Sequence, residues 1–176
     1  GVPRYVAGVD ISPPDHRGLA VGAAVVLEQP GLEIVEVKTF EGEPGFPYMP
    51  GLLSFREAHL ILGALEQLAT TPDLILVDGQ GLAHPRRFGL ACHLGLFTEV
   101  STIGCAKSVL KGRPAGVLSP QAGAYVDLLD RGEVVGAAVR TRTSVNPIYV
   151  SIGHRVSLAG AIEAVLACCK GYRMPE

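Results

Sequence analysis

The feature that most constrains the fold is a short apolar run at residues 73–78, DLILVD. Its length suits a strand, and nearly continuous hydrophobicity is typical of a strand buried on both faces of a sheet. Apolar residues recur at helical spacing before it, over 54–70, and after it, over 86–98, and a second strand-like run follows at 101–106. This alternation of helices and strands predicts parallel neighbouring strands in the centre of an α/β sheet.

The flanking segments predict a sheet of mixed direction. Three runs near the N-terminus, at 5–11, 20–27 and 32–40, have strand patterns and short turn-rich links, which favour an antiparallel meander. Further strands and a last helix are expected at 124–129, 133–140, 147–151 and 157–170. We therefore predict an α/β fold with a central mixed sheet of five or more strands, combining the antiparallel meander with parallel strands and flanked by helices.

Size and composition favour one intracellular domain. The 176 residues, 48% of them hydrophobic and 18% charged, suit a single packed domain over residues 1–176. The longest apolar run, 20–27, is too short to span a membrane, and no secretory leader pattern opens the sequence. No CxxC spacing occurs among the cysteines, so we expect reduced core residues and a cytoplasmic location. The four are Cys92, Cys105, Cys168 and Cys169.

The net charge of −2 conceals a division of charge along the chain. Residues 1–78 contain 4 basic and 11 acidic side chains, whereas residues 79–176 contain 11 basic and 6 acidic ones. An acidic half beside a basic half is compatible with a cation site next to a surface for a polyanion. Chance segregation of solvated faces gives the same pattern, so the chemistry depends on particular residues.

Three carboxylates stand where carboxylates are uncommon. Asp10 and Asp78 each end an apolar strand-like run, and Glu57 lies in line with Ile61 and Ala64 on the apolar stripe of the helix at 54–70. Each has an ordinary alternative: a strand-end Asp can begin a turn, and Glu57 completes a capping box with Ser54. Taken together, they predict an oxygen-rich metal site at one end of the sheet.

His154 is a further candidate, because it precedes the apolar stripe of the last predicted helix. A histidine there is more often structural, but beside carboxylates it could bind metal or transfer a proton. Hard oxygen ligands without a thiolate pattern favour Mg²⁺ or Mn²⁺ over zinc. Carboxylates that hold these ions commonly serve phosphodiester cleavage.

Six strings distributed from about Tyr5 to Pro175 carry a specific resemblance. They are GVDIS, PYMPGLLSFRE, DLILVDGQGLAHPRRFGLACHLG, TIGCAKSVL, RTRTSVNPIYVSIGHRVSL and KGYRMPE. Together they resemble the endonuclease V family. The resemblance implies an RNase H-like fold and a Mg²⁺-dependent endonuclease, with Mn²⁺ as an alternative ion. It also implies recognition of inosine, the product of adenine deamination, and hydrolysis of the second phosphodiester bond on its 3′ side. The ends left would be 3′-hydroxyl and 5′-phosphate, and the role DNA repair.

The resemblance assigns roles by position. Asp10, Glu57 and Asp78 match the metal carboxylates, His154 a histidine beside the metal, and Lys107 a lysine that contacts the scissile phosphate or assists the attacking water. The segment that resembles a lesion wedge comprises Pro47, Tyr48, Met49 and Pro50. The expected base pocket comprises Gly51, Leu53, Gly79, Gln80, Gly81 and His84. The candidate contacts to the nucleic-acid backbone are Arg86, Arg87, Lys111, Arg113, Arg140 and Arg142.

The sequence leaves several alternatives open. Another RNase H-like nuclease, such as a hydrolase of RNA–DNA hybrids, would not need the PYMP segment. A non-catalytic nucleic-acid-binding module would be expected to lack a carboxylate, and an actin-like ATPase would need a glycine-rich phosphate loop. Inosine-containing DNA is the favoured substrate and single-stranded RNA the alternative. We expect a monomer with no membrane partner.

Overall fold

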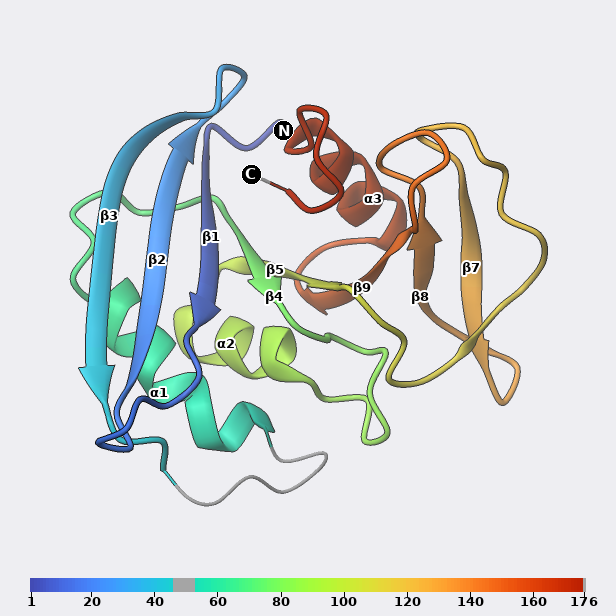
Figure 1. Cartoon of the computed structure of the whole chain (residues 1–176). Coiled ribbons are helices and arrows are strands. Elements are labelled where there is room, and N and C mark those ends of the chain that lie inside the picture. The colour runs from blue at the N-terminus through green and yellow to red at the C-terminus, as the bar shows by residue number, and fades with distance from the viewer. Residues whose placement is uncertain (46–52, 176) are drawn as a thin grey trace.

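The computed structural model describes residues 1–45 and 53–175, with only the backbone described for residues 53–56. In this part of the chain nine strands form one sheet, in the order β3-β2-β1-β4-β5-β9-β8-β7-β6 (Figure 1). The strands are β1 Tyr5–Ile11, β2 Ala20–Glu28, β3 Glu33–Gly42, β4 Leu74–Asp78, β5 Ser101–Ala106, β6 Arg113–Pro114, β7 Tyr125–Asp130, β8 Glu133–Val139 and β9 Ile148–His154. The helices are α1 Leu53–Leu65, α2 Leu90–Thr98 and α3 Leu158–Ala167.

The sheet is mixed, as the sequence predicts. Strands β1, β2 and β3 form an antiparallel meander, while β1, β4 and β5 run parallel to one another. Strand β9 then pairs antiparallel with β5, and the remaining strands continue antiparallel to the edge at β6. Strand β4 lies in the interior of the sheet, and its first four residues are buried, which explains its continuous hydrophobicity.

Helices cover both faces of the sheet (Figure 1). Helices α1 and α2 pack on one face, where Val9 and Val77 belong to a core cluster with Ile61 and Leu94. Helix α3 packs on the other face, in a cluster that includes Leu76. A smaller cluster lies beneath β7 and β8. The parallel centre, the antiparallel meander and the helices on both faces are those of an RNase H-like α/β fold, so the predicted fold class is confirmed.

Several element boundaries differ from those predicted. Helix α2 begins at Leu90 rather than residue 86, because Arg87 adopts a left-handed backbone conformation and Gly89 is extended at the helix start. Helix α1 ends at Leu65, and the Glu36 carboxylate of β3 accepts hydrogen bonds from two amides in the segment that follows. Residues 113–114 form the short strand β6, which is not among the strands predicted from the sequence. Helix α3 is shorter than predicted, and β9 extends further, to residue 154.

No disulfide joins any of the four cysteines, all of which lie in the described part of the chain, as predicted. Cys92, Cys105 and Cys168 are buried, and Cys169 is partly buried. Burial raises the pKa of the Cys168 thiol to about 11, which keeps it protonated at neutral pH. Separately, no helix among residues 1–45 and 53–175 has the length and hydrophobicity to cross a membrane.

Candidate active site

The two strand-end aspartates lie level with each other on adjacent strands. Parallel pairing of β1 with β4 places Val9 opposite Val77, so Asp10 and Asp78 follow at the same end of the sheet. Since side chains alternate along a strand, both carboxylates leave the face opposite the one covered by α1 and α2. The predicted convergence of these two residues is therefore present.

Both aspartates line a pocket of about 370 Å³ on this face. Lys107, which follows the end of β5, supplies the third charged group of the lining. Most of the remaining lining is apolar and comes from β1, β2, β4 and the C-terminal tail. It includes Val6, Gly8, Val25, Leu27, Leu76, Met174 and Pro175. The pocket thus has a charged end, formed by Asp10, Asp78 and Lys107, against an apolar wall.

The electrostatics of this end leave a surplus of negative charge. The pKa of the Asp78 carboxyl is raised, first by burial and then by repulsion from Asp10. Lys107 partly offsets this effect, because its Nζ lies 3.8 Å from Asp78 Oδ2. The side chains of Lys107 and Asp78 are 61% and 33% exposed. Two carboxylates face one ammonium group, so a divalent cation would relieve the repulsion between Asp10 and Asp78.

Glu57 approaches the same end of the sheet from the other face. The α1 backbone at Leu60 packs closely on Gly22, and Gly22 pairs with Ile11 at the end of β1. Glu57 lies one turn earlier in α1 and is partly buried. Among the described residues, no three His, Cys, Asp or Glu side chains come close enough to hold a metal ion together. A ligand role for Glu57 therefore stays a prediction.

His154 lies away from the two aspartates, contrary to the placement expected from the sequence. It is the last residue of β9 rather than part of a helix start, and it pairs with Thr102 near the beginning of β5. Asp78 pairs with Cys105, three residues further along β5, which corresponds to about 10 Å. His154 also packs against Gly95 of α2, on the opposite face. The antiparallel direction of β9 causes this separation, because it carries the strand away from the Asp78 end.

The loop after β4 packs tightly on β9 instead of presenting free amides. The Gly81 amide donates to Ser151 Oγ at 2.8 Å, and the Leu82 amide donates to the Ile152 carbonyl at 2.8 Å. A Cβ at Gly81 would overlap that carbonyl. Glycine is therefore required at position 81 because the backbone of β9 approaches too closely for a side chain.

The other residues of the expected base pocket are only partly described. His84 is 5% exposed, and its Nδ1 accepts from the Arg86 amide at 3.1 Å. The Gln80 side chain donates from Nε2 to the Ser108 carbonyl at 3.1 Å, whereas the Gly79 amide donates to the Cys105 carbonyl. Gly51, the Leu53 side chain and the wedge Pro47–Pro50 lie outside the described residues. The base pocket therefore stays a prediction.

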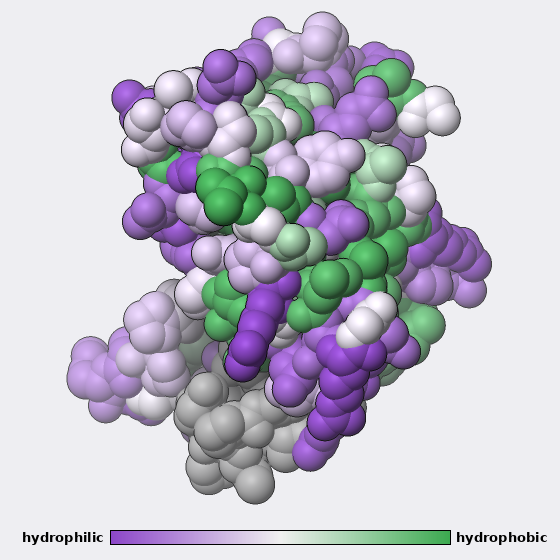
Figure 2. Space-filling model, turned by 90° about the vertical axis from the view of Figure 1, so that its right-hand side faces the viewer, coloured by the Kyte–Doolittle hydropathy of each residue, from purple (hydrophilic) through white to green (hydrophobic). Residues whose placement is uncertain are grey.

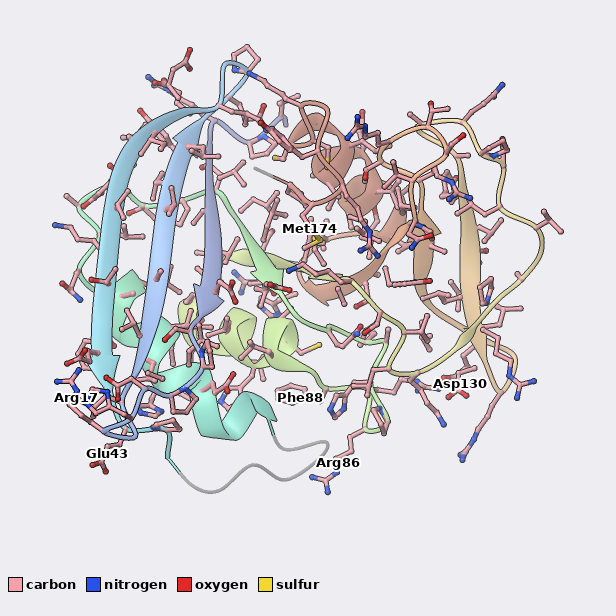
Figure 3. All side chains as sticks on the ribbon, in the orientation of Figure 1. Arg17, Glu43, Arg86, Phe88, Asp130 and Met174 are labelled. Carbon is pink, nitrogen blue, oxygen red and sulfur yellow. The ribbon has the colours of Figure 1, made fainter. Side chains whose placement is uncertain are left out.

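Half of the six basic candidates are engaged within the protein. Arg87 Nη2 lies 2.6 Å from Asp130 Oδ2, Lys111 Nζ lies 3.8 Å from Asp130 Oδ1, and Arg140 donates to the carbonyls of Ser119 and Val145. The other three candidates are exposed and, within the described part of the chain, form no ion pair; they are Arg86, Arg113 and Arg142. Arg86 projects from the tip of its loop (Figure 3). Figure 2 shows hydrophilic and apolar side chains interspersed on the β7–β8 side of the molecule.

The Arg87–Asp130 pair makes a prediction about acid stability. The hydrogen bond from Arg87 lowers the pKa of the Asp130 carboxyl, so the pair stabilises the fold above the ordinary aspartate pKa and loses its effect as pH falls through the lowered value. We expect Arg87→Met to lower the thermal midpoint at pH 7, with the difference from wild type shrinking steadily below about pH 4. Thermal unfolding between pH 7 and pH 2 measures this.

Arg113→Met is the matched control for that measurement, because Arg113 lies in the neighbouring β6 without an ion pair among the described residues. Its midpoint should follow the wild type at every pH. A constant difference between Arg87→Met and wild type down to pH 2 would contradict the assigned role of Asp130.

Sequence reasoning did not assign a role to the C-terminal tail, although KGYRMPE was among the strings that carry the resemblance. Met174 and Pro175 line the same pocket as Asp10 and Asp78, and Met174 lies near the centre of the molecule in Figure 3. Arg173 donates to the Lys107 carbonyl. No periodicity or motif chemistry marks such contacts, because they depend on where the chain returns after α3.

Comparison with known proteins identifies the family of this chain. The family model described as Endonuclease V matches residues 1–176. The curated Endonuclease V of Gloeobacter violaceus is 58% identical, over 100% of this chain and 72% of its own length. The crystal structure of Endonuclease V from Streptomyces avermitilis superposes with a TM-score of 0.93 at 46% identity, covering 97% of this chain and 75% of that one.

A third relative was solved with nucleic acid bound. Endonuclease V of Ciona intestinalis, in complex with a 24mer DNA containing an inosine followed by a ribo-adenosine, has a TM-score of 0.84 at 32% identity. The match covers 98% of this chain and 80% of that one. The family model spans the whole sequence, and relatives above 50% identity share that name. The chain therefore belongs to the Endonuclease V family and is a nuclease that hydrolyses phosphodiester bonds.

Proposed function

We propose that this chain is a Mg²⁺-dependent endonuclease that recognises inosine in DNA and hydrolyses the second phosphodiester bond on its 3′ side. The observation that carries the proposal is the level placement of Asp10 and Asp78 beside Lys107 at one end of the parallel strands. The complex of the Ciona intestinalis relative with inosine-containing DNA supports the choice of lesion. The products would have 3′-hydroxyl and 5′-phosphate ends, and the pathway served would be DNA repair.

The residues at this end fit a hard divalent cation. Asp10 and Asp78 supply carboxylate oxygens, the donors that Mg²⁺ and Mn²⁺ prefer. Burial, and after it repulsion from Asp10, raises the pKa of the Asp78 carboxyl. We expect these two residues to hold the ion, with Glu57 as a further candidate. When bound, the ion would supply an activated water and neutralise charge on the scissile phosphate.

The protein's own groups have separate tasks in this scheme. Asp78, partly buried against the apolar wall, is held rigidly at a strand end rather than on a loop. Lys107 is mostly exposed, so its ammonium group can leave Asp78 and contact a phosphate oxygen. His154 has no task here, because the register of β9 places it near the other end of β5.

Cleavage of end-labelled oligonucleotides tests the proposal. Matched DNA and RNA strands would each contain one inosine or, as the control, adenosine at the same position. With Mg²⁺ we expect a single cut one nucleotide beyond the inosine on its 3′ side, in DNA, and none without metal. Cutting of the RNA alone would identify an inosine-specific endoribonuclease. Cutting of an RNA–DNA hybrid without inosine, or binding without any cut, would overturn the proposal.

A further inference from the structure

The C-terminal tail returns from α3 to the candidate active site and is fixed there by one side chain. Arg173 donates from Nη2 to the carbonyls of Lys107 at 2.8 Å and Pro147 at 2.9 Å, and from Nε to that of Asn146 at 3.0 Å. The Arg173 carbonyl in turn accepts from Thr141 Oγ1. A single guanidinium group thus joins the tail to the segment after β5 and the segment before β9.

This connection fixes the backbone of Lys107. The lysine follows the last residue of β5, and residues 107–110 are exposed. Two side chains hold its backbone: Arg173 at the Lys107 carbonyl and Gln80 at the neighbouring Ser108 carbonyl. Gln80 belongs to the loop after Asp78 and ties this segment to the end of β4, whereas Arg173 ties it to the C-terminal tail and to Pro147 just before β9.

The Lys107 side chain needs this support because its own ion pair is weak. An exposed ion pair contributes little to holding a side chain in place, and a lysine side chain has four flexible carbons. The ion pair between Lys107 and Asp78 is an exposed pair, because the Lys107 side chain is 61% exposed and its Nζ lies 3.8 Å from Asp78 Oδ2. The reach of the ammonium group is therefore set mainly by where the Lys107 backbone lies. The rigid fork of arginine donors suits that task, since it fixes several carbonyls at once.

We propose that Arg173 is a positioning residue that acts on catalysis through Lys107, by holding the segment after β5 against the end of the sheet that carries Asp78. Met174 and Pro175, the next two residues of the tail, line the pocket that contains Asp78. The inference rests on the proposed function, in which Lys107 contacts the scissile phosphate.

The test compares Arg173→Met with Arg155→Met. Arg155 also donates its guanidinium to a backbone carbonyl, that of Glu99, but it follows the far end of β9. We expect Arg173→Met to lower kcat on an inosine oligonucleotide about tenfold to a hundredfold, as misplacement of a catalytic group does. Its Kd for the same oligonucleotide without metal should stay within about twofold, and Arg155→Met should cleave like wild type.

Combination with Lys107→Met separates positioning from general stability. If Arg173 acts through Lys107, the double variant should cleave at the same rate as Lys107→Met alone, because the group being positioned is absent. The proposal would be overturned if Arg173→Met lowered the cleavage rate of Lys107→Met by the same factor as it lowers the rate of the wild type. Wild-type kcat in Arg173→Met would overturn it as well.

Hydrogen exchange provides a readout that does not depend on activity. Amides of residues 107–112 should exchange faster in Arg173→Met than in wild type, and at the wild-type rate in Arg155→Met. Should Arg173→Met fail to fold, Arg173→Lys, which can satisfy fewer carbonyls, should show a smaller change in the same direction. Failure of the wild type to cut inosine substrates would refute the proposed function, whereas unchanged exchange in both Arg173 variants would refute this inference.

Discussion

Replacing Asp78 by asparagine should abolish nicking and yet stabilise the metal-free protein. We expect the Mg²⁺-dependent cleavage rate to fall by about a thousandfold or more, because the variant loses a carboxylate at the centre of the proposed site. Burial and Asp10 raise the pKa of the Asp78 carboxyl. Its folded pKa thus exceeds its unfolded pKa, and stability is lost as pH rises through the folded value. At pH 7 the neutral asparagine avoids the stability lost when Asp78 ionises, so the thermal midpoint of the variant should exceed that of the wild type.

Mg²⁺ should reverse the order of stability. A ligand at one hundred times its Kd stabilises a folded protein by about 2.7 kcal/mol, and the wild type should gain this while the variant gains little. Thermal unfolding with and without Mg²⁺ measures both effects. Glu163→Gln on the exposed surface of α3 is the control and should follow the wild type in every assay. A variant that nicks normally, or responds to Mg²⁺ as the wild type does, would contradict the metal assignment.

Replacing Gly81 by alanine should cause a large loss of stability. The new Cβ would overlap the Ile152 carbonyl of β9, and backbone atoms cannot rotate away as a side chain could. We expect a loss of about 3 kcal/mol in the free energy of unfolding, the upper part of the range for overpacking. Denaturant titration measures it, with an unchanged slope showing that the unfolded state is not affected.

Gly8→Ala is the matched control for Gly81→Ala. Gly8 lies in β1 with open space around its Cα, so the added methyl group meets nothing within 4 Å. Removing a glycine from a strand with compatible geometry should leave stability equal or raise it by about 0.5 kcal/mol. Equal stability of the two variants would show that the loop after β4 can move away from β9, and the tight packing inferred at Gly81 would be wrong.

The sequence predicted the central strands and the two aspartates because their signals are local. A short apolar run such as DLILVD is typical of a strand buried on both faces, and a carboxylate directly after such a strand lies at its end. Parallel neighbours place such ends at one edge of the sheet. Asp10 and Asp78 therefore followed from pattern alone, and pairing of Val9 with Val77 confirms their alignment.

What the sequence could not predict depends on strand direction and chain return. The sequence pattern predicts a strand at 147–151 but neither its extension to residue 154 nor its antiparallel pairing with β5, and that pairing carries His154 away from Asp78. The basic candidates look alike in the sequence, but their surroundings differ. Arg87 pairs with Asp130 and Arg140 donates to a backbone carbonyl, whereas Arg86 is exposed. The contacts of Arg173 with Lys107 and Pro147 depend on where the tail returns after α3, which no local pattern encodes.

The most direct test of the account is the position of a bound metal ion. A crystal of the protein soaked in Mn²⁺, recorded at a wavelength where manganese scatters anomalously, would locate the ion without reference to activity. We predict an anomalous peak about 2.1 Å from carboxylate oxygens of both Asp10 and Asp78. The absence of a peak at this end of the sheet, or a peak only at other residues, would contradict the assignment of these aspartates as the metal centre of the nuclease.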